Sequence, residues 1–212
     1  QQATLHNLAG QRWQLRRQAG GAAADDAPLA WARMRVQVLG TGGARGQGLF
    51  VSDTEVVTLV DTLPAALFDP LHRALGQGAD LDATVHLVAQ DAQGRPVPLQ
   101  ARLVVRDLRT PLALLALSTP VAGAVWPQLS PIPELPRSPV WIGAWPGAGA
   151  ERWDGVVRWT AGSAPQPPGQ PKQATLAQAL HIDLTPSRAL SDAATVIGAP
   201  VFTGRLLAGI AH

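Results

Sequence analysis

The chain has no cysteine and no tyrosine, and Lys172 is its only lysine. Without cysteine it can form neither a disulfide framework nor a thiolate metal site. Charged residues make up 15% of the 212 residues and hydrophobic residues 46%, which is too apolar a composition for a disordered chain. No apolar run approaches the roughly 18 residues that a helix needs to cross a bilayer. The composition therefore favours a globular domain whose core rests on apolar packing.

The positive charge is almost entirely arginine. The net charge is +2, and the densest cluster is Arg12, Arg16 and Arg17, followed by Arg33 and Arg35. We expect a solvated basic segment here, with an Arg-dependent anion-binding or surface-binding module as an alternative. No aromatic-and-basic RNA-binding signature accompanies the arginines, so nucleic acid is not an expected partner. Because the chain begins at Gln1, a signal or membrane tether would lie outside it.

Short apolar segments separated by turn residues predict an all-β barrel or sandwich. In "ARMRVQVLG", Arg33, Arg35 and Gln37 alternate with apolar residues, which is the period of a half-buried strand. "TGGARGQG" is interpreted as a Gly-rich turn, residues 1–19 as a short helix and "LPAALFDPLHRALGQG" as a helical stretch. The predicted organisation is an N-terminal extension or linker, a first half, a Pro-rich connection and a second half that is incomplete at its end, at 1–30, 31–120, 121–136 and 137–212.

Asp61 is out of place in the apolar segment "VVTLVDTL". A charge in such a segment is costly unless it is paired. It is predicted either to cap a helix that begins near Leu63 or to join a local hydrogen-bond network. A different reading comes from the order of segments along the rest of the chain.

Five motifs in order resemble the trypsin-like serine proteases, and among them the HtrA-type bacterial branch. They are "GQGLFVSDTEVVTLVDTL", "RTPLALLAL" after "ARLVVRDLR", "VWIGAWPGAG", "WDGVVRW" and "TVIGAPVFTGRLLAGI". Each motif is weak alone, and their shared order is fairly specific. The resemblance covers roughly residues 32–211. It implies a fold of two antiparallel β-barrels, and a final strand that this chain, ending at His212, does not supply.

The same resemblance implies a degenerate catalytic site. Asp61 falls where the family has its catalytic histidine, Pro111 where it has the orienting aspartate, and Ile197 where it has the nucleophilic serine. Thr195 falls at a glycine of the family's oxyanion hole. Triad chemistry needs a nucleophile, a base and a carboxylate that orients the base. The resemblance therefore predicts a pseudoprotease that is not an enzyme.

Two other sets of residues carry side chains that are suited to catalysis or metal binding. Ser187 and Ser191 could belong to a relocated catalytic site, although loop serines are the simpler interpretation. His181 and Asp183 are two residues apart and share one face of a strand, so they are weak candidates for half a transition-metal site. Two ligands do not make a site, and we expect no metal and no cofactor.

The predicted function is that of a protein-binding scaffold or regulator in the bacterial periplasm or the lumen of a membrane organelle. The expected partner is a protein or an extended peptide, for example an active HtrA-type protease, because such barrels leave strand edges that can bind a peptide. The chain is also similar in type to magnetosome-associated trypsin-like pseudoproteases that act in biomineralisation. Their metal-binding histidine corresponds to Thr110 here, so metal binding does not carry over. The alternatives are an active hydrolase with a rearranged site and the Arg-dependent anion binder.

Overall fold

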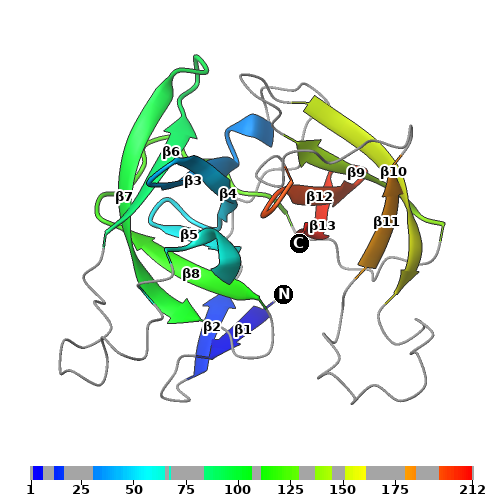
Figure 1. Ribbon diagram of the computed structural model, residues 1–212, viewed down its shortest axis with the longest axis horizontal. Coiled ribbons are helices and arrows are strands. Elements are labelled where there is room, and N and C mark those ends of the chain that lie inside the picture. The colour runs from blue at the N-terminus through cyan, green and yellow to red at the C-terminus, as the bar shows by residue number, and fades with distance from the viewer. Residues whose placement is uncertain are drawn as a thin grey trace.

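Strands dominate the computed structural model of the protein (Figure 1). It describes residues 2–6, 12–16, 31–64, 67, 84–106, 111–128, 137–144, 151–160, 180–184 and 196–211. The predicted all-β class is confirmed. None of the described helices is long and apolar enough to cross a membrane.

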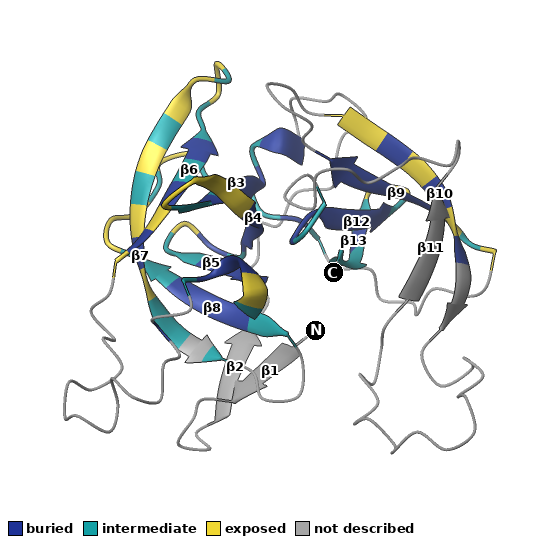
Figure 2. Ribbon diagram, viewed as in Figure 1, coloured by how far each residue is buried: buried dark blue, intermediate teal, exposed yellow. Residues whose placement is uncertain are grey.

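The first half forms a closed barrel of six antiparallel strands in the order β3-β4-β5-β8-β7-β6. Its strands are β3 (Arg35–Gly40), β4 (Gly43–Phe50), β5 (Glu55–Leu59), β6 (Val85–Gln90), β7 (Pro96–Arg106) and β8 (Leu112–Leu117). Inward-facing residues of these strands, including Val36, Val38, Val56, Val85 and Leu115, form one buried cluster (Figure 2). In β6 buried residues alternate with more accessible ones, which is the pattern expected of a strand in a closed barrel.

The second half forms a five-stranded antiparallel sheet in the order β11-β10-β9-β12-β13. Its strands are β9 (Pro139–Ala144), β10 (Glu151–Thr160), β11 (Leu180–Leu184), β12 (Pro200–Thr203) and β13 (Leu206–Ile210). Figure 1 shows it beside the barrel, with β12 and β13 nearest to it. A separate buried cluster, including Val140, Trp153, Val157 and Val201, lies within this sheet.

A third cluster joins the two halves. Trp31, Met34 and Leu49 come from the first half, and Trp141, Phe202 and Leu207 from the second. Trp141 stacks on Phe202 with ring centroids 4.3 Å apart and meets Trp31 edge-on at 6.1 Å. Aromatic rings bury large apolar areas and prefer such geometries. The sides of the two halves that face each other are therefore packed against one another.

Two interpretations of polar segments were wrong. The first described residues form a hairpin, β1 (Gln2–His6) paired with β2 (Arg12–Arg16), where a short helix was expected. β1 also contacts β7 of the barrel. The Gly-rich segment 41–48 is mostly strand, since β4 begins at Gly43 and only Thr41 and Gly42 form the turn. In both cases cross-strand hydrogen bonding outweighs local propensity.

The cap predicted for Asp61 stays a prediction, because most of the helix that was expected to begin near Leu63 lies outside the described residues. A 3-10 helix, η1, spans Val60–Thr62, and its N-cap position is Leu59, which makes no side-chain cap hydrogen bond. Asp61 therefore lies inside the first turn of η1. An acidic side chain there is still favourable, because the amide dipoles of a helical turn point their positive ends toward it. Most of the helical stretch predicted after Leu63, at 65–66 and 68–83, lies outside the described residues.

The turn between β6 and β7 leads to a prediction about pH. The Asp91 carboxylate accepts hydrogen bonds from the backbone N–H groups of Gln93 and Arg95 and from the Arg95 guanidinium. The backbone hydrogen bond from Arg95 is the main reason that the pKa of Asp91 is lowered. A carboxyl whose pKa is lower in the folded state stabilises the fold above its unfolded pKa, and this contribution is lost as the pH falls through the folded pKa.

We expect NMR titration to give Asp91 a midpoint below that of an ordinary aspartate. Arg95→Ala should raise the midpoint only partway, because the two backbone donors stay in place. A midpoint at or above the ordinary value would show that these hydrogen bonds do not form in solution.

Candidate functional site

The segment that carries Asp61 leaves the first barrel at the end of β5. Asp61 is exposed, whereas Val60 before it is half-buried and Thr62 after it is buried. Thr62 and Thr58 are fully buried beneath it and lie within hydrogen-bond distance, with their hydroxyl oxygens 2.9 Å apart. The Thr62 hydroxyl reaches the Leu59 carbonyl oxygen at 2.7 Å, and the Thr58 hydroxyl reaches the Gln47 carbonyl oxygen at 2.8 Å. Buried hydroxyls thus fix the turn that presents the Asp61 carboxylate.

Pro111 lies directly against this turn. Its carbonyl oxygen accepts a hydrogen bond of 2.7 Å from the N–H of Val60. β8 begins at the next residue, Leu112, which pairs with Leu59 of β5. The pairing of β5 with β8 therefore places residue 111 beside residues 60 and 61, although they are far apart in the sequence.

Ile197 approaches the same place from the second half. It lies in a turn, Val196–Gly198, and its carbonyl oxygen accepts a hydrogen bond of 2.8 Å from the N–H of Gln47 in β4. Gly46 is the point where the segments meet. A Cβ built on it would lie 2.5 Å from the Thr62 Cγ2 and 3.2 Å from the Ile197 Cγ2.

The structure thus brings the segments of Asp61 and Ile197 together at Gly46, and the Pro111 backbone contacts the Asp61 segment at Val60. Their side chains offer one exposed carboxylate and two groups without a proton to transfer, since isoleucine and proline carry no polar side-chain atom. Hydrogen bonding and close packing at this point hold a turn of the second half against the barrel. The site is a junction between the two halves that presents a negative charge.

Other predicted residues fall elsewhere. Thr195, Ser187 and Ser191 lie outside the described residues. His181 and Asp183 lie in β11, where they pair with Trp159 and Val156 of β10. Within the ranges that the structure describes, no three histidine, aspartate or glutamate side chains gather into a metal-binding group. The metal candidate therefore stays a prediction about two neighbouring residues.

Arg35 is a residue whose environment the sequence did not reveal. It was expected on the solvated face of its strand, but its side chain is only 3% exposed. Its Nη1 donates a hydrogen bond of 3.0 Å to the Gln47 Oε1, and Gln47 is itself 1% exposed. Burial lowers the pKa of Arg35 to about 8, because it disfavours the charged form. The outer face of β3 is covered at this end, so Arg35 cannot serve the surface anion site that its sequence neighbours suggested.

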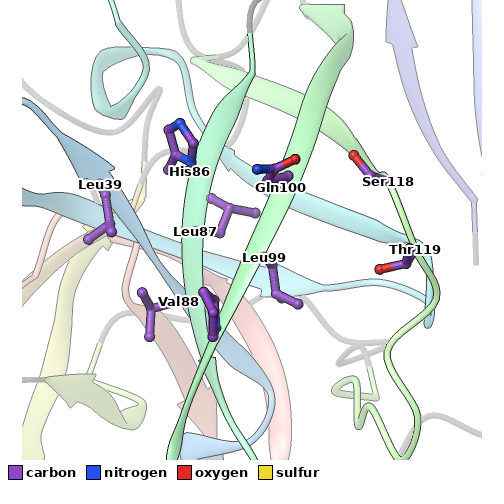
Figure 3. A pocket seen from close by; sticks show the side chains of 9 residues that line it. Leu39, His86, Leu87, Val88, Leu99, Gln100, Ser118 and Thr119 are labelled. Atoms are coloured by element: carbon purple, nitrogen blue, oxygen red, sulfur yellow. The ribbon is translucent and has the colours of Figure 1, made fainter.

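A hollow of about 430 Å³ lies on the first barrel, away from this junction (Figure 3). Polar atoms in its lining come from His86, Gln100, Ser118 and Thr119, all of which are exposed. His86 was predicted to be an ordinary strand residue, and it lies in β6. None of the residues at the junction lines the hollow, and its lining carries no acidic or basic residue apart from His86. It is a surface feature separate from the candidate site.

A comparison with models of protein families finds no match, and a search of curated proteins finds no relative. Solved structures do match. The Rv3671c protease of M. tuberculosis, in an inactive form, has a TM-score of 0.56 at 17% identity, over 89% of this chain and 84% of that one. Kallikrein-related peptidase 10 has a TM-score of 0.60 at 16% identity, over 88% and 83%. The MamO protease domain of Magnetospirillum magneticum has 0.53 at 17% identity, over 84% and 83%.

These comparisons contradict the prediction that the chain is not an enzyme. Structures with its fold are named as proteases, a peptidase and a serine endoprotease. The prediction had relied on the residue types at three positions, and a hydrolase can recruit its nucleophile and base from other side chains of the same fold. The resemblance to the trypsin-like proteases themselves is confirmed at the level of the fold. This chain has the two-part β fold of the trypsin-like serine proteases, which include the HtrA-type enzymes.

Proposed function

We propose that the protein binds an extended segment of another polypeptide beside the junction of its two halves, and that it acts as a scaffold or regulator of that partner. The observation that supports this proposal most directly is the outer edge of β13 at Ile210, where no strand pairs in the described part of the chain. β13 is the outermost described strand of its sheet, and such an edge can accept one more strand.

The register of β13 shows which backbone groups are available. Leu207 uses its N–H on the outer edge, where it donates to the Gln128 carbonyl oxygen at 2.7 Å. The backbone groups of Ala211 point to the inner edge, toward β12. Its N–H donates to the Ala199 carbonyl oxygen, and its carbonyl oxygen accepts from the Gly198 N–H. Backbone groups alternate along a strand, so Ile210, which precedes Ala211, points its N–H and carbonyl oxygen to the outer edge. In the ranges that the structure describes, no strand pairs with that edge at Ile210.

A peptide that pairs with Ile210 would lie along the outer edge of β13, on the opposite side of that strand from β12, Gly198 and Ala199. Several lines support a polypeptide ligand over a small one: the edge is linear, its contacts come from backbone groups, and structures of this fold are named as proteases and peptidases. From the resemblance we also propose the bacterial periplasm or the lumen of a membrane organelle as its location.

Binding can be tested with fluorescein-labelled casein as an unfolded polypeptide probe, followed by fluorescence polarisation. We expect the intact protein to bind casein and Ile210→Pro to lose at least about tenfold in affinity, because proline removes the outward N–H while edge strands tolerate proline. Ile210→Val keeps the N–H and should bind as the intact protein does. Equal binding by both variants, or no binding by the intact protein, would contradict the proposal.

A second candidate function is hydrolysis at a rearranged site, which the protease comparison favours. Residue 197 is isoleucine, so a hydroxyl nucleophile would have to come from another residue, and Ser187 and Ser191 are the candidates that the sequence offers. The same labelled casein reports cleavage as a rise in dequenched fluorescence. Cleavage that Ser187→Ala or Ser191→Ala abolishes, and that Ile210→Pro weakens, would combine the two functions in one site.

A further inference from the structure

Gln47 makes three hydrogen bonds at the junction, two through its backbone and one through its side chain. Its N–H donates to the Ile197 carbonyl oxygen, its own carbonyl oxygen accepts from the Thr58 hydroxyl, and its side-chain oxygen accepts from the Arg35 guanidinium. One residue thus joins a buried cation in the barrel to a turn of the other half. We propose that Arg35 positions the Gln47 side chain, and that Gln47 in turn holds the Ile197–Gly198 turn against the barrel.

The course of β5 makes this contact possible. β4 pairs with β5 at Gly48, Leu49 and Phe50, and the pairing goes no further than Gly48 and Thr58. On the other side β4 stays paired with β3, where Gln47 lies opposite Gln37. At Gln47 one edge of β4 is therefore released from β5. The Ile197 carbonyl oxygen takes the place that a β5 acceptor would have had.

The fit at this contact leaves no room for a side chain at residue 198. Gly198 has φ of +80°, and a Cβ on it would overlap the Gln47 carbonyl oxygen. Its N–H donates to the Ala211 carbonyl oxygen at 2.9 Å, which ties the turn to the end of β13. The position of the Gln47 backbone therefore sets the position of the turn and, through it, of the strand edge at Ile210.

Arg35 is suited to hold Gln47 because both side chains are almost completely buried. A buried amide oxygen that accepts from a guanidinium cannot rotate away without losing a charge-assisted hydrogen bond. Rotation would also leave buried polar atoms of the two side chains without a hydrogen-bond partner. This penalty keeps the Gln47 side chain in one conformation. Arg35 acts through Gln47, as a positioning residue, and the inference holds whatever ligand the junction binds.

Hydrogen exchange measured residue by residue by NMR tests the proposal, because the Gln47 amide has the Ile197 carbonyl oxygen as its acceptor. We expect Arg35→Met to lower the protection of the Gln47 amide at least about tenfold while the Leu87 amide in the barrel stays unchanged. Arg35→Lys keeps a cationic donor and should retain most of the protection. Arg33→Met is the matched control, since Arg33 donates to the Gly123 carbonyl oxygen instead.

Gln47→Met provides a second route if Arg35→Met does not fold. It keeps the size of the side chain, removes the acceptor for Arg35, and should lower the protection of the residue 47 amide in the same way. Unchanged protection at residue 47 in either folded variant would overturn the proposal. So would an equal loss of protection at Leu87, because that would show a general loss of stability.

Discussion

Replacing Gly198 by alanine is expected to cost about 4 kcal/mol in the free energy of unfolding, which places it among the largest effects of single substitutions. Two causes add. The left-handed backbone at φ +80° is strained for any residue with a Cβ, and the added Cβ would overlap the Gln47 carbonyl oxygen. The overlap is with backbone inside a closed barrel, so it cannot be relieved by rotating a side chain. Urea unfolding followed by circular dichroism measures the change.

Gly204 is the matched control for this prediction. It also has a positive φ, of +54°, but nothing lies within 4 Å of the Cβ that alanine would add. Gly204→Ala should therefore cost only the backbone strain, about 1 kcal/mol. Similar losses for the two variants would show that the close approach between the Ile197 turn and Gln47 does not exist in solution.

Phe202→Ala is expected to destabilise the protein by a similar amount, about 4 kcal/mol, since large aromatic side chains in cores usually cost 3–5 kcal/mol on truncation. Phe202 is fully buried between the two halves and stacks on Trp141. Its removal would leave a cavity lined by Trp31, Met34 and Leu49 as well. Calorimetry measures the loss as a lower melting temperature.

Phe202→Leu is the control, because it keeps much of the volume and should cost about 1 kcal/mol. Near-ultraviolet circular dichroism of the Phe202→Ala protein should also change, since Trp141 loses its stacking partner. If Phe202→Ala and Phe202→Leu had the same melting temperature as the unaltered protein, the cluster would not be the packed interface between the halves.

Much of the fold could be predicted from local pattern. The alternation around Val36 and Val38, the hairpin of β6 and β7 and the apolar run of β8 were each expected from the sequence and found as strands. Such segments are predictable because burying one face of a strand imposes a period of two residues. The Gly-rich start of β4 broke this rule. Gly46 and Gly48 in this strand allow the close approach of neighbouring segments, so the turn signal of glycine was misleading there.

The candidate site was less predictable. The order of motifs gave the positions of Asp61, Pro111 and Ile197, but no local pattern could indicate that Arg35 is buried. Its strand alternates as if one face were in water. The second half of the protein covers that face, and a neighbour so far away in sequence leaves no mark on the local period.

The sequence by itself determined the all-β class, the extent of most strands and the residue types at the three junction positions, because each depends on side-chain chemistry and short-range periodicity. Only the tertiary structure decided that β5 parts from β4 at Gly48, that the Ile197 turn fills the released edge, and that Arg35 is enclosed beside Gln47. These features depend on contacts between segments about 150 residues apart in the case of Gln47 and Ile197. Such contacts form only when both halves are packed. A carbonyl oxygen of one half then replaces water as the hydrogen-bond partner of a backbone N–H group in the other half.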